Sequence, residues 1–324
     1  IAAQMIDNFG TGKIGNGLEV ALGGGRTYFL PNTVFDPEYA TTKGRRTDGR
    51  NLTTEFTAKF GGEYVWNKAQ FDAINPASTT KLLGLFEPSH MQYDVDRPAD
   101  TAGEPTLAEM TDKAIKEKKK NPKGYFLMVE GGRIDHGSHA GNAYRTLSDT
   151  VAFSDAVKKA LEKVDLKDTL VIVTADHSHT LTIAGYPKRG NPILGKVVSP
   201  GKTTPDLAAD GEPYTTVGFA NGIGYYQSQP GDAVYAQTAR AGRIEDMTAV
   251  DTEDPDFHQE VTVPLQGGET HAGEDVAIYA GGPNAHLFQG VQEQSYIYYV
   301  MKDAFGSEKK GKDDDRHHED RDWR

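Results

Sequence analysis

The chain has 324 residues and no cysteine, which allows one large α/β domain with an insertion, or two domains, and excludes disulfides and thiol nucleophiles. Its 35 basic and 47 acidic side chains give a net charge of -12, which argues against nucleic acid, itself negatively charged, as a partner. Hydrophobic residues make up 37% of the chain, and because no apolar run reaches about 18 residues the sequence predicts no membrane span.

The first informative elements lie in the middle of the chain. Thr106 and Glu109 form a capping box, which predicts a helix that reaches about Lys118. The apolar run Tyr125 to Val129 predicts a strand buried on both faces, with Glu130 at its carboxyl end.

A helix and two strands are predicted further along. Apolar residues recur at near-helical spacing from about Tyr144 to Lys163, which predicts a crossover helix. Leu170 to Thr174 predicts the next strand, with Asp176 at its end, and residues 275–280 predict a return to the sheet. We therefore expect Glu130 and Asp176 at equivalent ends of two parallel neighbouring strands, where α/β sheets gather ligands.

The alternation of strands and helices predicts an α/β fold, a three-layer sandwich around a mostly parallel central sheet. Residues 187–266 interrupt it with many Gly, Pro, Thr and Asp, and predict an insertion over the active-site face or at a subunit interface. The core is expected in residues 1–186 and 267–306. Residues 307–324 are nearly all charged or polar, which predicts a disordered tail.

Acidic and imidazole side chains occur in or beside three of these predicted strand patterns, in VEGGRIDHGSHAGNA, VIVTADHSHT and GGETHAGEDV. Asp135 and His139 are four residues apart, so a helical turn would place both on one face. Asp176 and His177 are adjacent, and they can reach one ion only where the backbone leaves regular alternation. Carboxylate and imidazole are usual zinc ligands, so these segments predict a metal site. Lone histidines are assigned no role: His90, His258 and His286.

With these segments the chain resembles the alkaline phosphatase family. The resemblance also includes LGLFEP, LAEMTDKAI, VALGGGRTYFLP and SYIYYVMKDAFG, and it runs from near the start to about Gly306, weakening between about Pro187 and Gly267. It implies an alkaline phosphatase-like fold, incomplete at its amino-terminal side. It also implies hydrolysis of phosphate monoesters by a homodimer that is periplasmic or secreted.

The resemblance further implies two zinc ions and one magnesium ion. The implied ligands are Asp135, His139 and His271 for the first zinc, Asp176 and His177 for the second, and Glu130 for magnesium. His136 occupies a position that lies near the substrate phosphate in the family. His179 would be a further ligand or, as we expect, a donor that orients a metal-bound carboxylate.

The family's serine nucleophile stands in an Asp-Ser-Ala context, which neither Ser78 nor Ser89 shares. We therefore expect the chain to be the carboxyl-terminal part of a longer enzyme. The phosphoserine intermediate would form on a serine outside residues 1–324, in the missing amino-terminal portion or a separate polypeptide. One alternative is a catalytically inert metal-binding fragment of such an enzyme. Another is a sulfatase, phosphodiesterase or phosphomutase relative, which would not be expected to match THAGEDV and LGLFEP as well.

Overall fold

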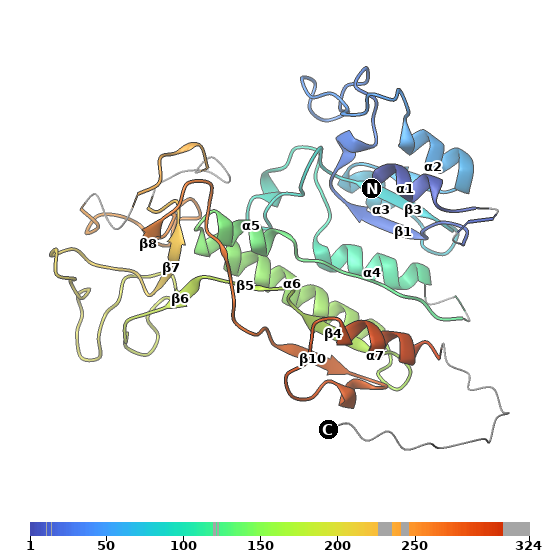
Figure 1. The fold of residues 1–324 in the computed structure, drawn as a ribbon. Coiled ribbons are helices and arrows are strands. Elements are labelled where there is room, and N and C mark those ends of the chain that lie inside the picture. Colours follow the sequence, from blue (N-terminus) through green and yellow to red (C-terminus); the bar gives the residue numbers. More distant parts are fainter. Residues whose placement is uncertain are drawn as a thin grey trace, which may run out of the picture. The chain divides into compact units, whose positions relative to one another are not determined.

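The computed structural model describes residues 1–10, 12–13, 15–118, 121, 123–225, 235–240 and 246–306. They form two compact units, whose elements are labelled in Figure 1. Unit 1 comprises residues 1–163 and 178–273, and unit 2 comprises residues 164–177 and the chain from residue 274 onward. The predicted tail, residues 307–324, lies outside the described residues.

The α-helices are α1 (Ala2–Asp7), α2 (Leu52–Phe60), α3 (Lys68–Ala73), α4 (Leu107–Lys118), α5 (Arg133–His139), α6 (Ala143–Lys163) and α7 (Tyr296–Ala304). The strands are β1 (Val20–Gly23), β2 (Glu63–Val65), β3 (Leu82–Leu85), β4 (Val171–Thr174), β5 (Ser178–His179), β6 (Leu181–Ile183), β7 (Val217–Gly222), β8 (Val261–Pro264), β9 (His271–Ala272) and β10 (Ile278–Gly281). Short 3-10 helices are η1 (Arg26–Tyr28), η2 (Arg97–Ala99) and η4 (Ala285–Leu287).

A parallel sheet of order β1-β3-β2 forms the amino-terminal part of unit 1. Its central strand β3 is buried along its whole length, because apolar residues cover both faces of the sheet. Leu83 and Leu85 pack with Phe56 of α2, whereas Leu82 packs with Phe71 of α3. The α/β class with a parallel sheet, predicted from the sequence, is confirmed.

The helix predictions in this unit are confirmed. Glu109 Oε2 accepts a hydrogen bond from the Thr106 backbone N–H at 2.8 Å, and Thr106 Oγ1 accepts one from the Glu109 N–H at 3.1 Å. This reciprocal pair is the predicted capping box, and it satisfies N–H groups that the first turn of a helix leaves open. The helix predicted from about Tyr144 to Lys163 is α6, which packs against both α4 and α5, but it does not cross between parallel strands, because residues 125–129 form no strand.

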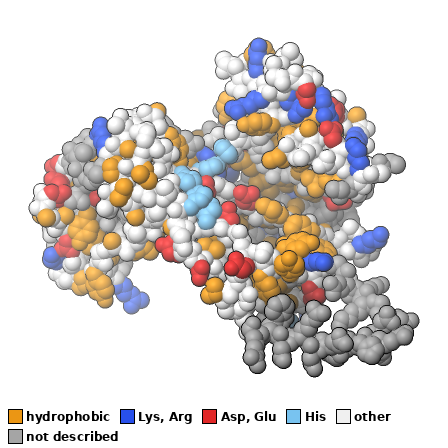
Figure 2. All heavy atoms as spheres, in the orientation of Figure 1, with side chains coloured by type: hydrophobic (Ala, Val, Ile, Leu, Met, Phe, Trp, Pro, Cys, Tyr) orange, Lys and Arg blue, Asp and Glu red, His pale blue; other side chains and the backbone are white. Residues whose placement is uncertain are grey.

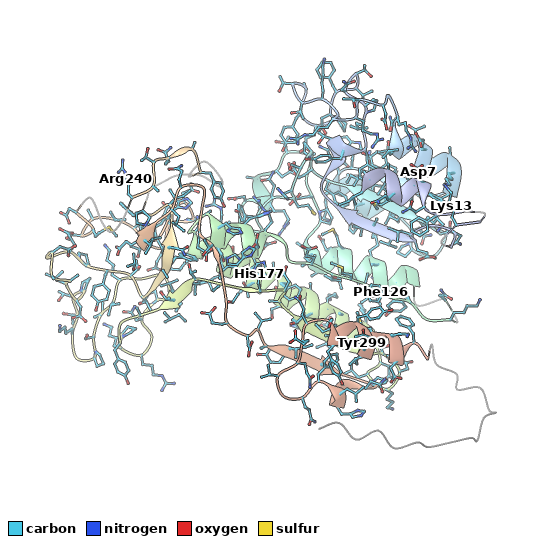
Figure 3. The ribbon with its side chains drawn as sticks, in the orientation of Figure 1. Asp7, Lys13, Phe126, His177, Arg240 and Tyr299 are labelled. Carbon is cyan, nitrogen blue, oxygen red and sulfur yellow. The ribbon has the colours of Figure 1, made fainter. Side chains whose placement is uncertain are left out.

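The predicted buried strand at residues 125–129 is wrong. The described residues form no strand there, and the chain continues from this segment into α5. Exposed and half-buried side chains alternate along it: Phe126, labelled in Figure 3, is 62% exposed, and Met128 is 70% exposed. Without a neighbouring strand, the apolar run cannot bury both of its faces.

Two further sheets belong to unit 1. Strands β6, β7 and β8 form a sheet in which β7 pairs antiparallel with β6 and parallel with β8. Val217, Phe219 and Val261 of this sheet pack against Ala143 at the start of α6. Strand β5 pairs antiparallel with β9, which joins two distant parts of the chain.

Unit 2 is built on an antiparallel pair of β4 and β10, followed by α7, whose Tyr299 is labelled in Figure 3. The strand predicted at Leu170 to Thr174 is confirmed as β4, whereas the one expected at residues 275–280 begins at Ile278. The expected parallel neighbours are absent, because residues 125–129 form no strand and β4 pairs antiparallel with β10. Within the described ranges, no helix has the length and apolar character needed to cross a membrane.

Candidate metal centre

Helix α5 carries two of the predicted ligands, Asp135 and His139, one turn apart on the same face. The helix lies close against α6, because a Cβ on Gly137 would be 2.8 Å from the Thr146 backbone nitrogen. Ser138 Oγ also lies 3.2 Å from Thr146 Oγ1. The long helix therefore fixes the position of the short one.

The β5–β9 pair supplies two further imidazoles. His179 and His271 are direct partners across the antiparallel ladder, although 92 positions separate them in the sequence. Side chains of directly opposed residues leave on the same face of such a pair. Figure 2 shows histidine side chains gathered on the surface, with acidic side chains beside them.

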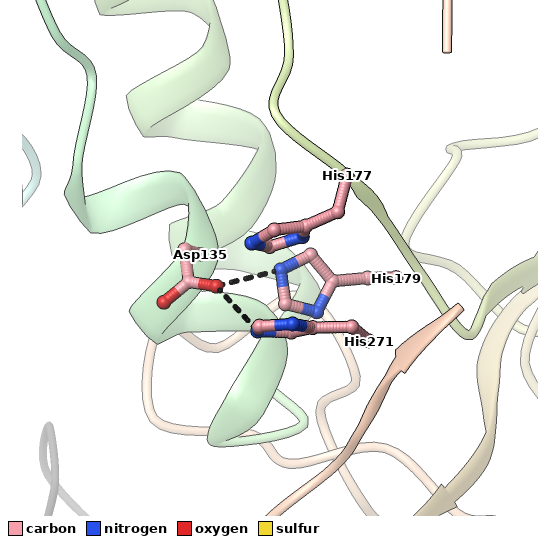
Figure 4. A group of neighbouring side chains, drawn as sticks. All are labelled: Asp135, His177, His179 and His271. Carbon is pink, nitrogen blue, oxygen red and sulfur yellow. Dashed lines mark hydrogen bonds and ion pairs between the residues drawn. The ribbon is translucent and has the colours of Figure 1, made fainter. Parts of the chain in front are cut away.

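Asp135, His139 and His271 come together around one point. His139 Nε2 lies 3.1 Å from His271 Nε2 and 3.3 Å from Asp135 Oδ1, and His271 Nε2 lies 3.4 Å from the same oxygen. Figure 4 shows Asp135 facing the rings of His179 and His271. All three members of the predicted first zinc site therefore present one ligand atom to a common space.

His139 is oriented by the main chain of Glu269. Its Nδ1 lies 2.5 Å from the Glu269 carbonyl oxygen, and the Glu269 N–H donates to the His139 carbonyl at 3.0 Å. Because a carbonyl only accepts, this network assigns the proton to Nδ1 and, in the neutral ring, leaves the Nε2 lone pair facing Asp135 and His271. A neutral imidazole with a lone pair at Nε2 is the form that binds zinc.

His179 lies between two carboxylates. Its Nδ1 is 2.7 Å from Glu269 Oε2, and its Nε2 is 3.0 Å from Asp135 Oδ1. Burial lowers the pKa of His179, but the hydrogen bond and charge of Glu269, with the charge of Asp135, outweigh burial and raise it. Burial raises the pKa of Glu269, but hydrogen bonds from His179 and Thr180 outweigh burial and hold it below its usual range.

His136, the predicted phosphate neighbour, lies on α5 beside Arg133. Arg133 Nη1 is 3.0 Å from His136 Nδ1, and its guanidinium stacks 3.6 Å above the ring of buried Tyr93. The ring of His90 meets the ring of His136 edge to face, with 4.3 Å between centroids. His90 thus contacts a predicted site residue, although its sequence context had given no sign of this.

The other predicted ligands are placed differently. Asp176 and His177 belong to unit 2, just after β4, and Gln294 donates to the Asp176 carbonyl at 3.0 Å. Glu130 is exposed in the segment before α5, and its Oε1 would lie 3.2 Å from a Cβ on Gly132. The roles of these three residues stay predictions. His177, which Figure 4 also draws, is a residue of unit 2.

The molecule therefore combines an α/β fold that contains a parallel sheet with a cluster of one carboxylate and two imidazoles suited to a metal ion. The family described as Alkaline phosphatase matches residues 2–306, and the chain belongs to the alkaline phosphatase family.

Curated relatives support the same membership. The chain is 41% identical over 308 residues to the tissue-nonspecific alkaline phosphatase of Gallus gallus, which covers 93% of this chain and 54% of the relative. It is 39% identical over 312 residues to an alkaline phosphatase of Gadus morhua, covering 93% and 59%. The chain thus spans between half and three fifths of the length of these relatives.

Solved structures show the same fold. The alkaline phosphatase of Thermus thermophilus matches with a TM-score of 0.61 and 24% identity, over 94% of this chain and 64% of that one. The enzyme of the Antarctic bacterium TAB5 matches with a TM-score of 0.55 and 20% identity, over 94% and 63%.

Glu269 and His90 contact the site but were missed from the sequence. Glu269 precedes His271 by two positions inside the quoted GGETHAGEDV segment, so its position on the approach to a strand was a usable signal. His90 had no such signal, because only tertiary packing brings the loop after β3 to α5.

Proposed function

We propose that this chain carries the metal-binding part of a phosphomonoesterase, which hydrolyses phosphate monoesters at a site with two zinc ions and one magnesium ion. The reaction is proposed to pass through a phosphoserine whose serine lies outside residues 1–324. Membership of the alkaline phosphatase family supports this, and the observation that carries it is the convergence of Asp135, His139 and His271.

The spacing of these three residues fits zinc. Ligand atoms at the corners of a tetrahedron, about 2.0–2.1 Å from a central zinc ion, lie about 3.3–3.4 Å from one another. The three observed separations are 3.1, 3.3 and 3.4 Å. One carboxylate oxygen and two imidazole nitrogens also leave the fourth position open, which is usual for catalytic zinc.

Residues of this chain would then act in distinct ways. Bound zinc supplies positive charge that stabilises anionic oxygens and lowers the pKa of water. Asp135, His139 and His271 hold that charge in place. His136 accepts from Arg133 at Nδ1, so its neutral ring carries the proton on Nε2, from which it is proposed to donate to a phosphate oxygen.

The second zinc and the magnesium complete the proposal. We assign Asp176 and His177 to the second zinc and Glu130 to magnesium, by their positions in the family motifs. A mutant of TAB5 alkaline phosphatase with magnesium bound in its M3 site supports a magnesium ion in a structural neighbour. The phosphate dianion needs charge stabilisation and alignment above all, which a set of divalent cations provides.

Metal analysis of the purified 35.3 kDa chain tests the proposal. Zinc titration should reveal binding that His271→Ala removes, whereas His286→Ala, outside the cluster, should bind as the wild type does. The chain alone should not turn over p-nitrophenyl phosphate. A zinc content in His271→Ala equal to that of the wild type would overturn the ligand assignment. Turnover of p-nitrophenyl phosphate by a chain of verified intact mass would overturn the proposal that the nucleophilic serine lies outside residues 1–324.

A further inference from the structure

Glu269 contacts the candidate metal centre through both its main chain and its side chain. It lies two residues before His271 and is only 3% exposed. Its backbone N–H and C=O both bond to His139, at 3.0 Å to the His139 carbonyl and 2.5 Å to Nδ1. Glu269 and His139 are therefore fixed to each other at two points.

The carboxylate of Glu269 binds two different donors with its two oxygens. Oε2 lies 2.7 Å from His179 Nδ1, and Oε1 accepts from the Thr180 backbone N–H at 2.5 Å. The Thr180 bond ties the carboxylate to the end of β5, so its direction is set by the backbone. The His179 bond then sets the orientation of the ring, whose Nε2 reaches Asp135 Oδ1 at 3.0 Å.

One residue is thereby connected to all three members of the cluster. It reaches His139 directly through the main chain, Asp135 through the ring of His179, and His271 through the two residues of chain that separate them. Partners of this kind fix the ring orientation and basicity of metal ligands, and losing one typically costs about 10- to 100-fold in metal affinity.

We infer that Glu269 is a positioning residue of the metal centre, acting on Asp135 through His179. The inference rests on the proposed function, since it concerns the same site. Only a carboxylate meets the requirement, because both donors need an acceptor. A glutamine offers one acceptor oxygen, so its NH2 group would face either His179 Nδ1–H or the Thr180 N–H.

A double-mutant cycle of zinc affinity tests this directly. Glu269→Gln and His179→Gln should each weaken zinc binding by about 10- to 100-fold, and the double variant should bind no more than about twofold weaker than His179→Gln. Glu87→Gln is the matched control, since Glu87 is equally buried but accepts from Gln92 and Tyr39. It should bind zinc as the wild type does.

Histidine ring NMR of the metal-free chain separates positioning from folding. The Nδ1 proton of His179 should be seen in the wild type and lost in Glu269→Gln. The ring of His258 is an internal reference, because it is fully buried with Nδ1 2.7 Å from the Ala140 carbonyl. Its signal should persist in both, which shows that the fold is intact.

Three results would overturn the inference: unchanged zinc affinity in Glu269→Gln, fully additive losses in the cycle, or a His179 signal that survives the substitution. If Glu269→Gln does not fold, His179→Gln tests the inference in its place. Wild-type zinc affinity in His179→Gln would show that the ring through which Glu269 is inferred to act on Asp135 does not affect zinc binding. A wild type that binds no zinc overturns this inference and the metal site together. If the chain binds zinc and the cycle is non-additive, but no preparation that includes the missing amino-terminal portion has phosphatase activity, the inference about Glu269 stands. Only the proposed function is then overturned.

Discussion

The surroundings of Arg26 and the metal centre of Asp135 both gather charged groups in unit 1, but they do so in opposite ways. Arg26 is fully buried, and Asp36 binds its Nε and Nη2 at 2.7 Å each, while Glu38 binds Nη2 at 2.8 Å. Its Nη1 donates to three main-chain carbonyls, those of Trp66, Leu85 and Phe86. Each nitrogen of the guanidinium therefore has an acceptor.

At the candidate metal centre, by contrast, the atoms that face one another are one carboxylate oxygen and two imidazole nitrogens, each of a kind that binds a metal ion. Asp135 Oδ1 and the Nε2 atoms of His139 and His271 lie 3.1 to 3.4 Å apart, and they are partly open to solvent. The comparison teaches that the two clusters differ in how their polar atoms are satisfied: around Arg26 donors meet acceptors, whereas around Asp135 three possible ligand atoms face one space. The charge of Arg26 is paired within unit 1, whereas the proposed function implies that the candidate metal centre gains stability when a cation binds.

The largest effect is expected from Arg26→Met. The substitution leaves Asp36 and Glu38 buried without their cation, and breaking a buried pair in this way costs about 3–5 kcal/mol. Urea unfolding of the metal-free chain measures the loss. Arg50→Ala is the control, because Arg50 pairs with Asp7 and Glu55 at the surface and should cost about 1 kcal/mol or less. Equal losses of unfolding free energy in the two variants would show that the buried pairs of Arg26 stabilise the chain no more than the surface pairs of Arg50.

Zinc should stabilise the wild type by a somewhat smaller amount. A ligand present at 100 times its Kd adds about 2.7 kcal/mol when it binds only the folded state. Thermal unfolding with and without zinc should show this increase, and Asp135→Asn should abolish it. Asp155→Asn, an exposed change on α6, should respond to zinc as the wild type does. A zinc response that survives Asp135→Asn would mean that the cation binds elsewhere.

The pH dependence of stability tests the carboxyl groups that surround Glu87, on which the charge of Arg26 acts. Burial, with the charge of Glu87, raises the pKa of Glu104 to about 8. Because the folded state holds this proton more tightly than the unfolded state, its stabilising effect is complete below about 4.5 and is lost as pH rises through about 8.

Replacing Glu104 with Gln tests this sign. Glu104→Gln should flatten the fall in unfolding free energy between pH 4.5 and 8, measured by urea unfolding with a chelator present. A slope that stays the same in Glu104→Gln would show that this carboxyl does not hold its proton in the folded chain.

The smallest effect is expected at Phe126, which precedes the helix of the metal centre. Since its side chain is 62% exposed, Phe126→Ala should change stability by no more than about 0.5 kcal/mol. Phe71→Ala, in the core, should cost about 3–5 kcal/mol. Chemical denaturation of both variants makes the comparison, and a large loss at Phe126 would indicate that residues 125–129 are buried after all.

Local patterns predicted α4 and α6 because the signals of these two helices are contained in a few neighbouring residues. The capping box of Thr106 and Glu109 and the helical spacing up to Lys163 depend on contacts three or four positions apart. The strand at residues 125–129 failed for the complementary reason. An apolar run indicates an extended backbone, but a strand also needs a partner, which lies elsewhere in a chain.

The candidate site divides in the same way. The choice of Asp135 and His139 followed from their spacing on one helix turn, and His271 from a motif. The motif that contains His271 also contains Glu269, but only the folded chain shows that the Glu269 carboxylate contacts His179, 90 positions away.

By itself the sequence determined the family, through motifs that resemble it, and it determined the α/β class and the residue types suited to zinc through the order of its elements and local spacing. Tertiary structure decided which side chains meet. Pairing β5 with β9 puts His179 opposite His271, and packing α5 on α6 brings Asp135 and His139 to them. Direct contact between side chains depends on distances of a few ångströms, and a linear order of residues does not fix those distances until the chain has folded.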